Sequence, residues 1–414
     1  MDVCMSHRLT SVALLAVAFY AASAHADNQN SGIFSFSGFG SAGLVHSSEK
    51  QADFTSSLFK PNGAGYSHNW SADVDSLLGA QVTAQFTPRL SAVLQVISEQ
   101  NYNNSYRPHV EWANVQYQVT SDFSVRVGRT VLPTFLFSGS RKVAYTYPWV
   151  RPPLAVYRLV PVTASDGLDV SYRLHVGDFT HTIQANYGRA QQSLPHGGVV
   201  DARRAWGITY TAEYHAATLH LAYQRPHLAI DGVQPLFNAF RQFGPEGVAL
   251  ADKYGRNGQP LAITAIGLSY DPGQWFATAE WGRAKSRSFL GDNTGWYVSG
   301  GYRFGRFTPY LTYARARTNN LSDPGLNLST LPPFLIGPAA GLNAALNSLL
   351  REKNVQNTLS VGGRWEVARN VAFKLQYDHT HIGAGSTGGL INLQPGFRTG
   401  GRVNVISAKF DFVF

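Results

Sequence analysis

Residues 406–414 have the sequence ISAKFDFVF and show the pattern on which the fold prediction rests. Its apolar residues stand at every second position, at Ile406, Ala408, Phe410, Phe412 and Phe414. Successive side chains of a β-strand point to opposite faces, so these five share one face. The intervening positions include a serine, a lysine and an aspartate. The stretch therefore predicts a strand with one apolar face and one largely polar face.

The same alternation recurs upstream, for example over residues 78–86, 219–224 and 371–378. A tilted strand of about ten residues is long enough to cross a bilayer. Seven short connections separate such strands, at residues 87–89, 120–122, 175–178, 215–218, 271–274, 305–306 and 368–370. Long connections alternate with them, at residues 46–75, 100–108, 132–165, 189–201, 226–258, 285–294, 317–353 and 381–401. We therefore predict an all-β fold, a transmembrane antiparallel β-barrel of about 16 strands with short periplasmic turns and long extracellular loops.

Composition supports this fold class. The chain has 414 residues, of which 14% are charged and 13% aromatic, with a formal net charge of +9. Outside the N-terminal segment no apolar run reaches the roughly 18 residues of a spanning helix. Lipid cannot satisfy backbone polar groups, so a sheet that crosses a membrane must close on itself. Aromatic rings near the short turns would then lie at the membrane interface.

The N-terminal 26 residues have the pattern of a secretory signal peptide. An apolar run from Leu9 to Ala22 precedes Ala24-His25-Ala26, a small-x-small cleavage site. The only cysteine, Cys4, lies in this segment. We therefore expect residues 1–26 to be removed and residues 27–414 to form the barrel, without a disulfide or a thiolate site.

Taken together, the signal peptide, the sixteen strands and the terminal phenylalanine resemble the outer-membrane porins of Gram-negative bacteria. Residues 36–40 (FSGFG) and 51–54 (QADF) are similar to a general-diffusion, porin-like subgroup. This resemblance implies a homotrimeric channel surrounded by outer-membrane lipid and lipopolysaccharide, with its third long loop folded into the pore. The acidic Pro-Glu-Phe-Gly-Gly stretch that general porins often carry in that loop is missing here.

The third long loop, at about 132–165, is the predicted constriction. It contains Arg141, Lys142, Arg151 and Arg158 and no acidic residue. Five prolines stiffen it, because proline fixes φ. A rigid basic segment in a narrow channel raises the local anion concentration, and salt screens poorly below the Debye length of about 8 Å. The alternative is that the loop lies on the wall or at a trimer contact, with its bases paired to barrel carboxylates.

The polar strand faces should line the water-filled interior of so wide a barrel. On the strands, the residues expected to influence selectivity are Arg126, Arg173, Arg303, Arg364 and Asp378. Further residues expected in the lumen by alternation are Gln81, Gln85, Asp169, Glu213, Glu280, Lys374, Lys409 and Asp411.

Other motifs have simpler explanations. Residues 38–43 match G-x-G-x-x-G, but alternation continues after them, so we expect a barrel strand and no cofactor site. His379 and His381 share a strand face without an evident third ligand, so no metal site is expected. The basic side chains form no single patch on a helix or strand that could contact nucleic-acid bases, which argues against nucleic-acid binding. Residues 338–353 have helical spacing and predict a short amphipathic helix in the seventh long loop.

The sequence thus predicts a passive channel for small hydrophilic solutes with mild anion preference, and no enzyme. Two alternatives stay open. One is a substrate-specific channel for a sugar or an organic acid, in which Tyr145, Tyr147, Trp149 and Tyr157 would supply stacking surfaces. The other is a non-conducting surface adhesin or receptor built on a plugged barrel.

Overall fold

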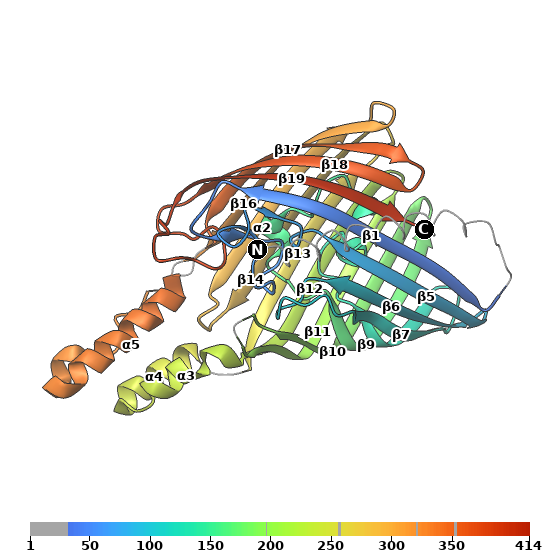
Figure 1. The fold of residues 1–414 in the computed structure, drawn as a ribbon. Helices are drawn as coiled ribbons and strands as arrows, with labels where there is room; N and C mark the ends of the chain where they lie inside the picture. Colours follow the sequence, from blue (N-terminus) through green and yellow to red (C-terminus); the bar gives the residue numbers. More distant parts are fainter. Residues whose placement is uncertain (1–31, 196, 256–257, 320–321, 352–353) are drawn as a thin grey trace.

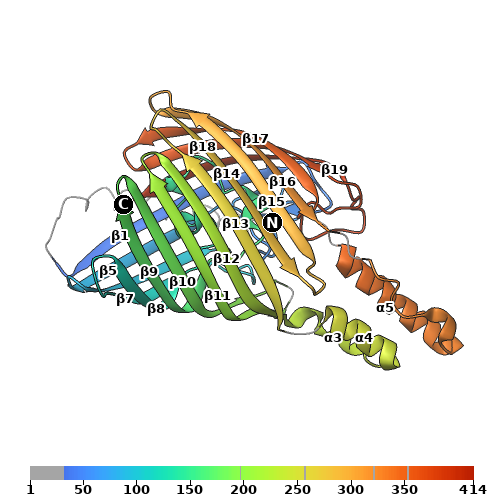
Figure 2. The ribbon, with the colours of Figure 1, turned by 180° about the vertical axis from the view of Figure 1, so that it is seen from behind.

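The structure is a computed structural model and describes residues 32–414 except 196, 256–257, 320–321 and 352–353. The predicted signal peptide lies outside the described residues. Sixteen long strands form one closed antiparallel barrel, the predicted fold (Figures 1 and 2). The strands are β1 Phe34–Ser47, β5 Leu77–Thr87, β6 Leu90–Glu99, β7 His109–Gln118, β8 Phe123–Val131, β9 Ala164–Val176, β10 Phe179–Ser193, β11 Val199–Tyr214, β12 Ala217–Ile230, β13 Gln259–Tyr270, β14 Trp275–Ser286, β15 Asp292–Tyr302, β16 Phe307–Thr318, β17 Gln356–Ala368, β18 Val371–Ile382 and β19 Gly401–Val413.

The barrel closes where the first strand meets the last. β1 pairs with β5 on one side and with β19 on the other, in a register that places Phe39 opposite Val413. On the outer face, the rings of Phe412 and Phe414 lie directly over Gly40 and Gly38, where any side chain would overlap them. The predicted G-x-G segment is therefore barrel strand, and its glycines make room for aromatic rings across the seam.

All seven predicted short turns connect the strands that alternation assigned. Two long loops are shorter than expected, spanning only residues 194–198 and 287–291. Their strands extend beyond the apolar band with polar residues such as Gln191 and Gln192, which pair with β11. Alternation of apolar and polar residues identifies only the lipid-facing part of a strand, so the sequence placed these strand ends too early.

The long loops carry the remaining elements. Two-residue strands β2 (Asp53–Phe54) and β3 (Ala64–Gly65) pair with each other, and β4 (Trp70–Ser71) pairs with β1. The helical segments are η1 Ser138–Ser140, η2 Ala144–Thr146, α2 Leu154–Tyr157, η3 Asp231–Val233, α3 Gln234–Phe240, α4 Gly244–Tyr254, η4 Leu328–Thr330 and α5 Pro333–Arg351.

Helices α3, α4 and α5 project together beyond the long-loop end of the barrel (Figures 1 and 2). They share a small core that includes Phe237, Phe240, Tyr254 and Leu346. The predicted helix of the seventh loop is confirmed as α5, but it begins five residues earlier, because proline is well suited to a first helical position. By length and composition alone α5 could cross a membrane. The strand ends on either side of it lie at the same rim, so one crossing there would not fit the barrel topology.

Candidate pore constriction

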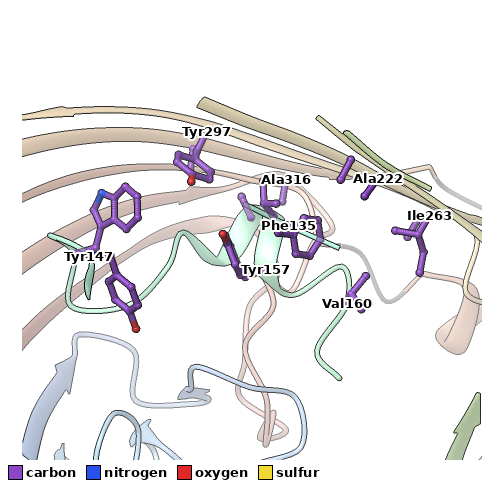
Figure 3. Close-up of a cluster of buried hydrophobic side chains, with 14 of the residues drawn as sticks. Phe135, Tyr147, Tyr157, Val160, Ala222, Ile263, Tyr297 and Ala316 are labelled. Atoms are coloured by element: carbon purple, nitrogen blue, oxygen red, sulfur yellow. The ribbon is translucent and has the colours of Figure 1, made fainter. Parts of the chain in front are cut away.

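The third long loop, residues 132–163, folds inside the barrel and packs against strands β12–β16. Its buried side chains, including Phe135, Tyr147, Tyr157 and Val160, form one apolar cluster with wall residues such as Tyr297 (Figure 3). An aromatic cluster of this kind stabilises the loop in one position, because each ring buries a large apolar area.

Two polar anchors reinforce this apolar contact. The buried carboxylate of Glu280 on β14 accepts hydrogen bonds from the hydroxyl groups of Tyr157 and Tyr297, both at 2.7 Å. It also accepts one from the backbone amide of Leu136, at 2.8 Å. The indole nitrogen of Trp149 donates to Ser299 Oγ at 2.8 Å. Glu280, predicted to face the water-filled lumen, therefore lies behind the loop.

Three wall cations also point at the loop and bind its backbone. Lys374 Nζ donates to the carbonyl oxygens of residues 144, 147 and 149, at 2.6, 2.7 and 3.0 Å. Lys409 donates to the carbonyl of residue 150, and Arg364 donates to those of residues 145 and 147. Lys374 and Lys409 are buried, and Lys374 is 2.9 Å from Asp411. These cations, expected to line open water, instead hold the loop in place.

Arg151 links the loop to both sides of the barrel seam. Its guanidinium donates to Asp75 of the first long loop at 3.0 and 2.5 Å, and to Ser407 Oγ on β19 at 2.6 Å. It also lies 3.3 Å from Asp378 on β18. Burial alone would raise the pKa of Asp75, but the Arg151 charge and hydrogen bonds outweigh it and lower that pKa. Arg151 and Asp378 therefore form a buried ionic junction, as the alternative interpretation of the loop predicted.

Arg158 has a different environment. It is 7% exposed and donates to the carbonyl oxygens of Thr55 in the first long loop and Gly389 in the eighth. It has no ion pair among the described residues. Burial, followed by repulsion from Arg151, lowers its pKa to about 10. Arg158 thus ties three loops together at the seam and has little contact with water.

Arg141 and Lys142 lie on the open side of the loop. Lys142 pairs with Glu99 at the end of β6. Arg141 donates to the carbonyl oxygens of Val160 and Tyr157, at 2.9 and 3.0 Å, and its guanidinium lies over the Tyr157 ring. It has no carboxylate partner in the described part of the chain. Its positive charge is therefore not neutralised by a direct ion pair.

A cavity of about 360 Å³ remains between this face of the loop and the wall formed mainly by β5–β10. Its lining contains six basic side chains and four carboxylates. They are Lys60, Arg129, Arg141, Lys142, Arg151 and Lys409, and Asp75, Glu99, Glu111 and Asp166. His109 also lines it, with Nε2 at 3.9 Å from Glu99 and 3.6 Å from Glu111. The cavity is polar and off-centre, because the loop occupies the opposite half of the barrel.

The remaining predicted selectivity residues lie away from this cavity. Arg126 on β8 is paired with the buried carboxylate of Asp169, with Nη2 at 2.6 Å from Oδ1. Arg173 is exposed near the short-turn end of β9. Arg303 follows the end of β15 and pairs with Asp271 of the neighbouring short turn, so it does not face the loop. Alternation predicts Arg303 on a strand, but it lies one position beyond the end of β15.

Sequence reasoning missed several residues of the cavity. Arg129 follows Gly128, which has a φ of +122°, and it pairs with Asp166 on β9. This irregular backbone breaks simple alternation, so parity could not place Arg129. Lys60 lies in the first long loop, where no periodicity indicates which side chains turn inward. Among the described residues, no group of three His, Cys, Asp or Glu side chains is arranged to hold a metal ion.

The molecule is thus a transmembrane β-barrel with a loop folded into its interior. In sequence, no family model and no curated protein matches the chain. In structure, it is similar to an anion-selective porin from Comamonas acidovorans (TM-score 0.55, 11% identity, 92% of this chain and 99% of that one). It is also similar to Salmonella typhi OmpF in complex with daunomycin (0.54, 12%, 92% and 97%) and to the outer membrane channel DcaP of Acinetobacter baumannii (0.54, 11%, 92% and 97%). The chain therefore has the fold of the outer-membrane porins.

Proposed function

We propose that this protein is a passive, water-filled channel of a Gram-negative outer membrane that lets small hydrophilic solutes diffuse and mildly prefers anions. The observation that carries this proposal is the polar cavity beside the third loop, with basic side chains in excess of carboxylates along its lining. In a narrow space of low polarisability, such an excess concentrates anions and repels cations. No catalytic step is part of this function.

Arg141 is the main candidate for the selectivity determinant. Lys142, Arg129 and Arg151 have carboxylate partners, whereas Arg141 binds only carbonyl groups. An ion pair reduces the field that a passing solute meets, and a carbonyl contact leaves the formal charge in place. The preference should therefore be mild, since most of the basic lining is compensated.

A sugar-specific channel is less well supported by the loop. Stacking on a sugar requires an accessible aromatic face, yet Tyr147, Trp149 and Tyr157 are each at most 3% exposed. Their rings are used for packing against the wall. An organic acid remains compatible with the cavity, because its carboxylates would meet Lys60 and Arg141.

The same proposal includes the orientation of the barrel in the outer membrane and its assembly into a trimer. The long loops, including the projecting helices, would face the outside, and the short turns the periplasm. Outer-membrane lipid and lipopolysaccharide would surround the exposed apolar belt. The homotrimer implied by the porin resemblance can be tested by crosslinking in the native membrane.

The channel proposal is tested by single-channel recording of the refolded protein in a planar bilayer under a KCl gradient. Stepwise conductance with a reversal potential favouring chloride is expected. A cation-favouring potential would retain the channel but overturn the anion preference. A folded barrel without conductance would overturn the channel and favour the plugged receptor. Block of the current by a solute at low concentration would identify a substrate-specific channel instead.

A further inference from the structure

Two charged side chains that line the cavity have no fixed partner of full opposite charge. Arg141 on the third long loop binds carbonyl oxygens and no carboxylate among the described residues. Glu111 on β7 is 6% exposed, and no lysine or arginine in the described part of the chain forms an ion pair with it. The basic group that contacts it is His109, with Nε2 at 3.6 Å from Oε2. One positive and one negative charge therefore face the same cavity.

These two charges come from opposite sides of the cavity. Arg141 belongs to the loop and Glu111 to the barrel wall, and the ion pair between Lys142 and Glu99 joins loop and wall beside them. Burial lowers the pKa of Arg141, and the negative charges of Glu111 and Glu99 act against that effect. Arg141 and Glu111 are thus near enough to interact across the cavity, although they form no direct ion pair.

The wall side of the cavity also has a buried hydrogen-bond acceptor without a donor. Gln100, which follows Glu99, lines the cavity and is 3% exposed. Its amide nitrogen donates to the side-chain oxygens of Asn62 and Asn104, at 2.6 and 2.9 Å. Its Oε1 receives no hydrogen bond from any described residue. Because a buried polar atom without a hydrogen bond is unfavourable, this side of the cavity favours a ligand that donates hydrogen bonds.

The two charges together favour a ligand that carries both signs. An organic acid would neutralise Arg141 but would be repelled by Glu111, and a cation would have the opposite effect. A zwitterion can place its carboxylate at Arg141, because a guanidinium offers paired N–H groups. Its ammonium group can then donate to Glu111 and to Oε1 of Gln100. Such a ligand satisfies two partly buried charges at once, each of which is costly when it has no partner.

We propose that the cavity selects small zwitterions, namely amino acids and short peptides. This inference rests on the proposed channel function and names the solutes that the channel favours. The cavity volume of about 360 Å³ is near the lower end of the range for small-molecule sites, which agrees with solutes of this size. Binding is weak, because a solute that passes through a channel must also leave the site. Small inorganic anions are still enriched by the excess of basic groups in the lining.

The test compares three solutes that share one carbon skeleton. They are alanine, a zwitterion; lactate, an anion; and alaninamide, a cation. Initial uptake of each labelled solute is measured in proteoliposomes that contain the refolded protein, at about pH 7.5, where histidine side chains are largely uncharged. Each rate is divided by the amount of folded barrel. Alanine should enter about threefold faster than either lactate or alaninamide.

Charge-removing variants separate the two ends of the site. Glu111→Gln should slow alanine about threefold and should accelerate lactate, because the carboxylate that repels an anion is gone. Arg141→Gln should slow both alanine and lactate, since it removes the group that binds either carboxylate. The matched control is Glu213→Gln, which removes an exposed carboxylate near the short-turn end of β11, outside the cavity. The control should leave the ratio of alanine to lactate uptake unchanged.

Two results with Glu111→Gln would overturn the proposal: unchanged alanine uptake, or a fall in lactate uptake parallel to that of alanine. Faster entry of lactate than of alanine into liposomes with the unmodified protein would also overturn it, and would leave an anion-preferring channel. Entry of none of the three solutes would refute the channel function itself, and this inference with it.

Discussion

Arg151 of the third long loop donates two hydrogen bonds to Asp75 of the first, and both side chains are buried at the barrel seam. The pair is 76 residues apart in sequence. The Arg151–Asp75 pair attaches one end of the third long loop to the loop that precedes β5.

Replacing Asp75 with asparagine should destabilise the barrel by roughly 3–5 kcal/mol, because it leaves the buried Arg151 cation without its closest counter-charge. The free energy of unfolding in detergent, from a urea titration, measures this. The Asp75→Asn, Arg151→Met double variant should be more stable than Asp75→Asn alone. A double variant as unstable as the sum of the two single variants would show that the pair is not coupled.

The Asp75–Arg151 pair should also make the free energy of unfolding depend on pH. The folded pKa of Asp75 is depressed below its ordinary value of 3.8, so its contribution is fully present above that value and is lost as pH falls through the folded pKa. The stability difference between the unmodified protein and Asp75→Asn should therefore be constant near neutral pH and shrink below about pH 4. Unfolding titrations at pH 7 and pH 2.5 measure it. A difference that is equal at both values would contradict the assignment.

Lys374→Met should loosen the constriction, because three carbonyl groups of residues 144–149 lose their shared donor. We expect a larger single-channel conductance and faster uptake of large neutral sugars in liposome swelling. The control is Arg369→Gln, which removes a basic residue from a short turn outside the lumen. Unchanged conductance in Lys374→Met would mean that the remaining contacts hold the loop in place without Lys374.

Arg141→Gln should move the reversal potential toward cations, since it removes a cavity cation that has no carboxylate partner among the described residues. Arg158→Gln should have a much smaller effect on selectivity, because that side chain is buried among three loops. Both potentials are measured under the same KCl gradient. A larger shift for Arg158→Gln would reverse the assignment of the two arginines.

Gly38→Ala should impair closure of the barrel, because the added methyl group would overlap the Phe414 ring across the seam. Overpacking of this kind costs about 1–3 kcal/mol. The folded fraction, read from heat-modifiable migration on a gel, should fall. Gly337→Ala, at a position on α5 with open space around it, serves as the control. Equal folding of both variants would show that the ring moves aside without cost.

The amino-acid sequence alone was enough to predict the closed barrel of about 16 strands, its seven short turns and the helix in the seventh loop. These features are local: alternation of period two and the periodicity of a helix are written in neighbouring residues. It also indicated that the third loop is basic, stiff and rich in aromatic residues.

The roles of those loop residues depend on the three-dimensional fold. Arg151 meets Asp75 and Asp378, Lys374 meets backbone carbonyls about 230 residues away, and Arg141 is left beside the cavity. Each of these contacts depends on how a loop without periodicity crosses the barrel. A buried cation is unfavourable without a hydrogen-bond acceptor or a counter-charge. The conformation of the loop determines which acceptor lies close enough to bind it. Alternation along a strand therefore does not predict which partner a buried ion will have.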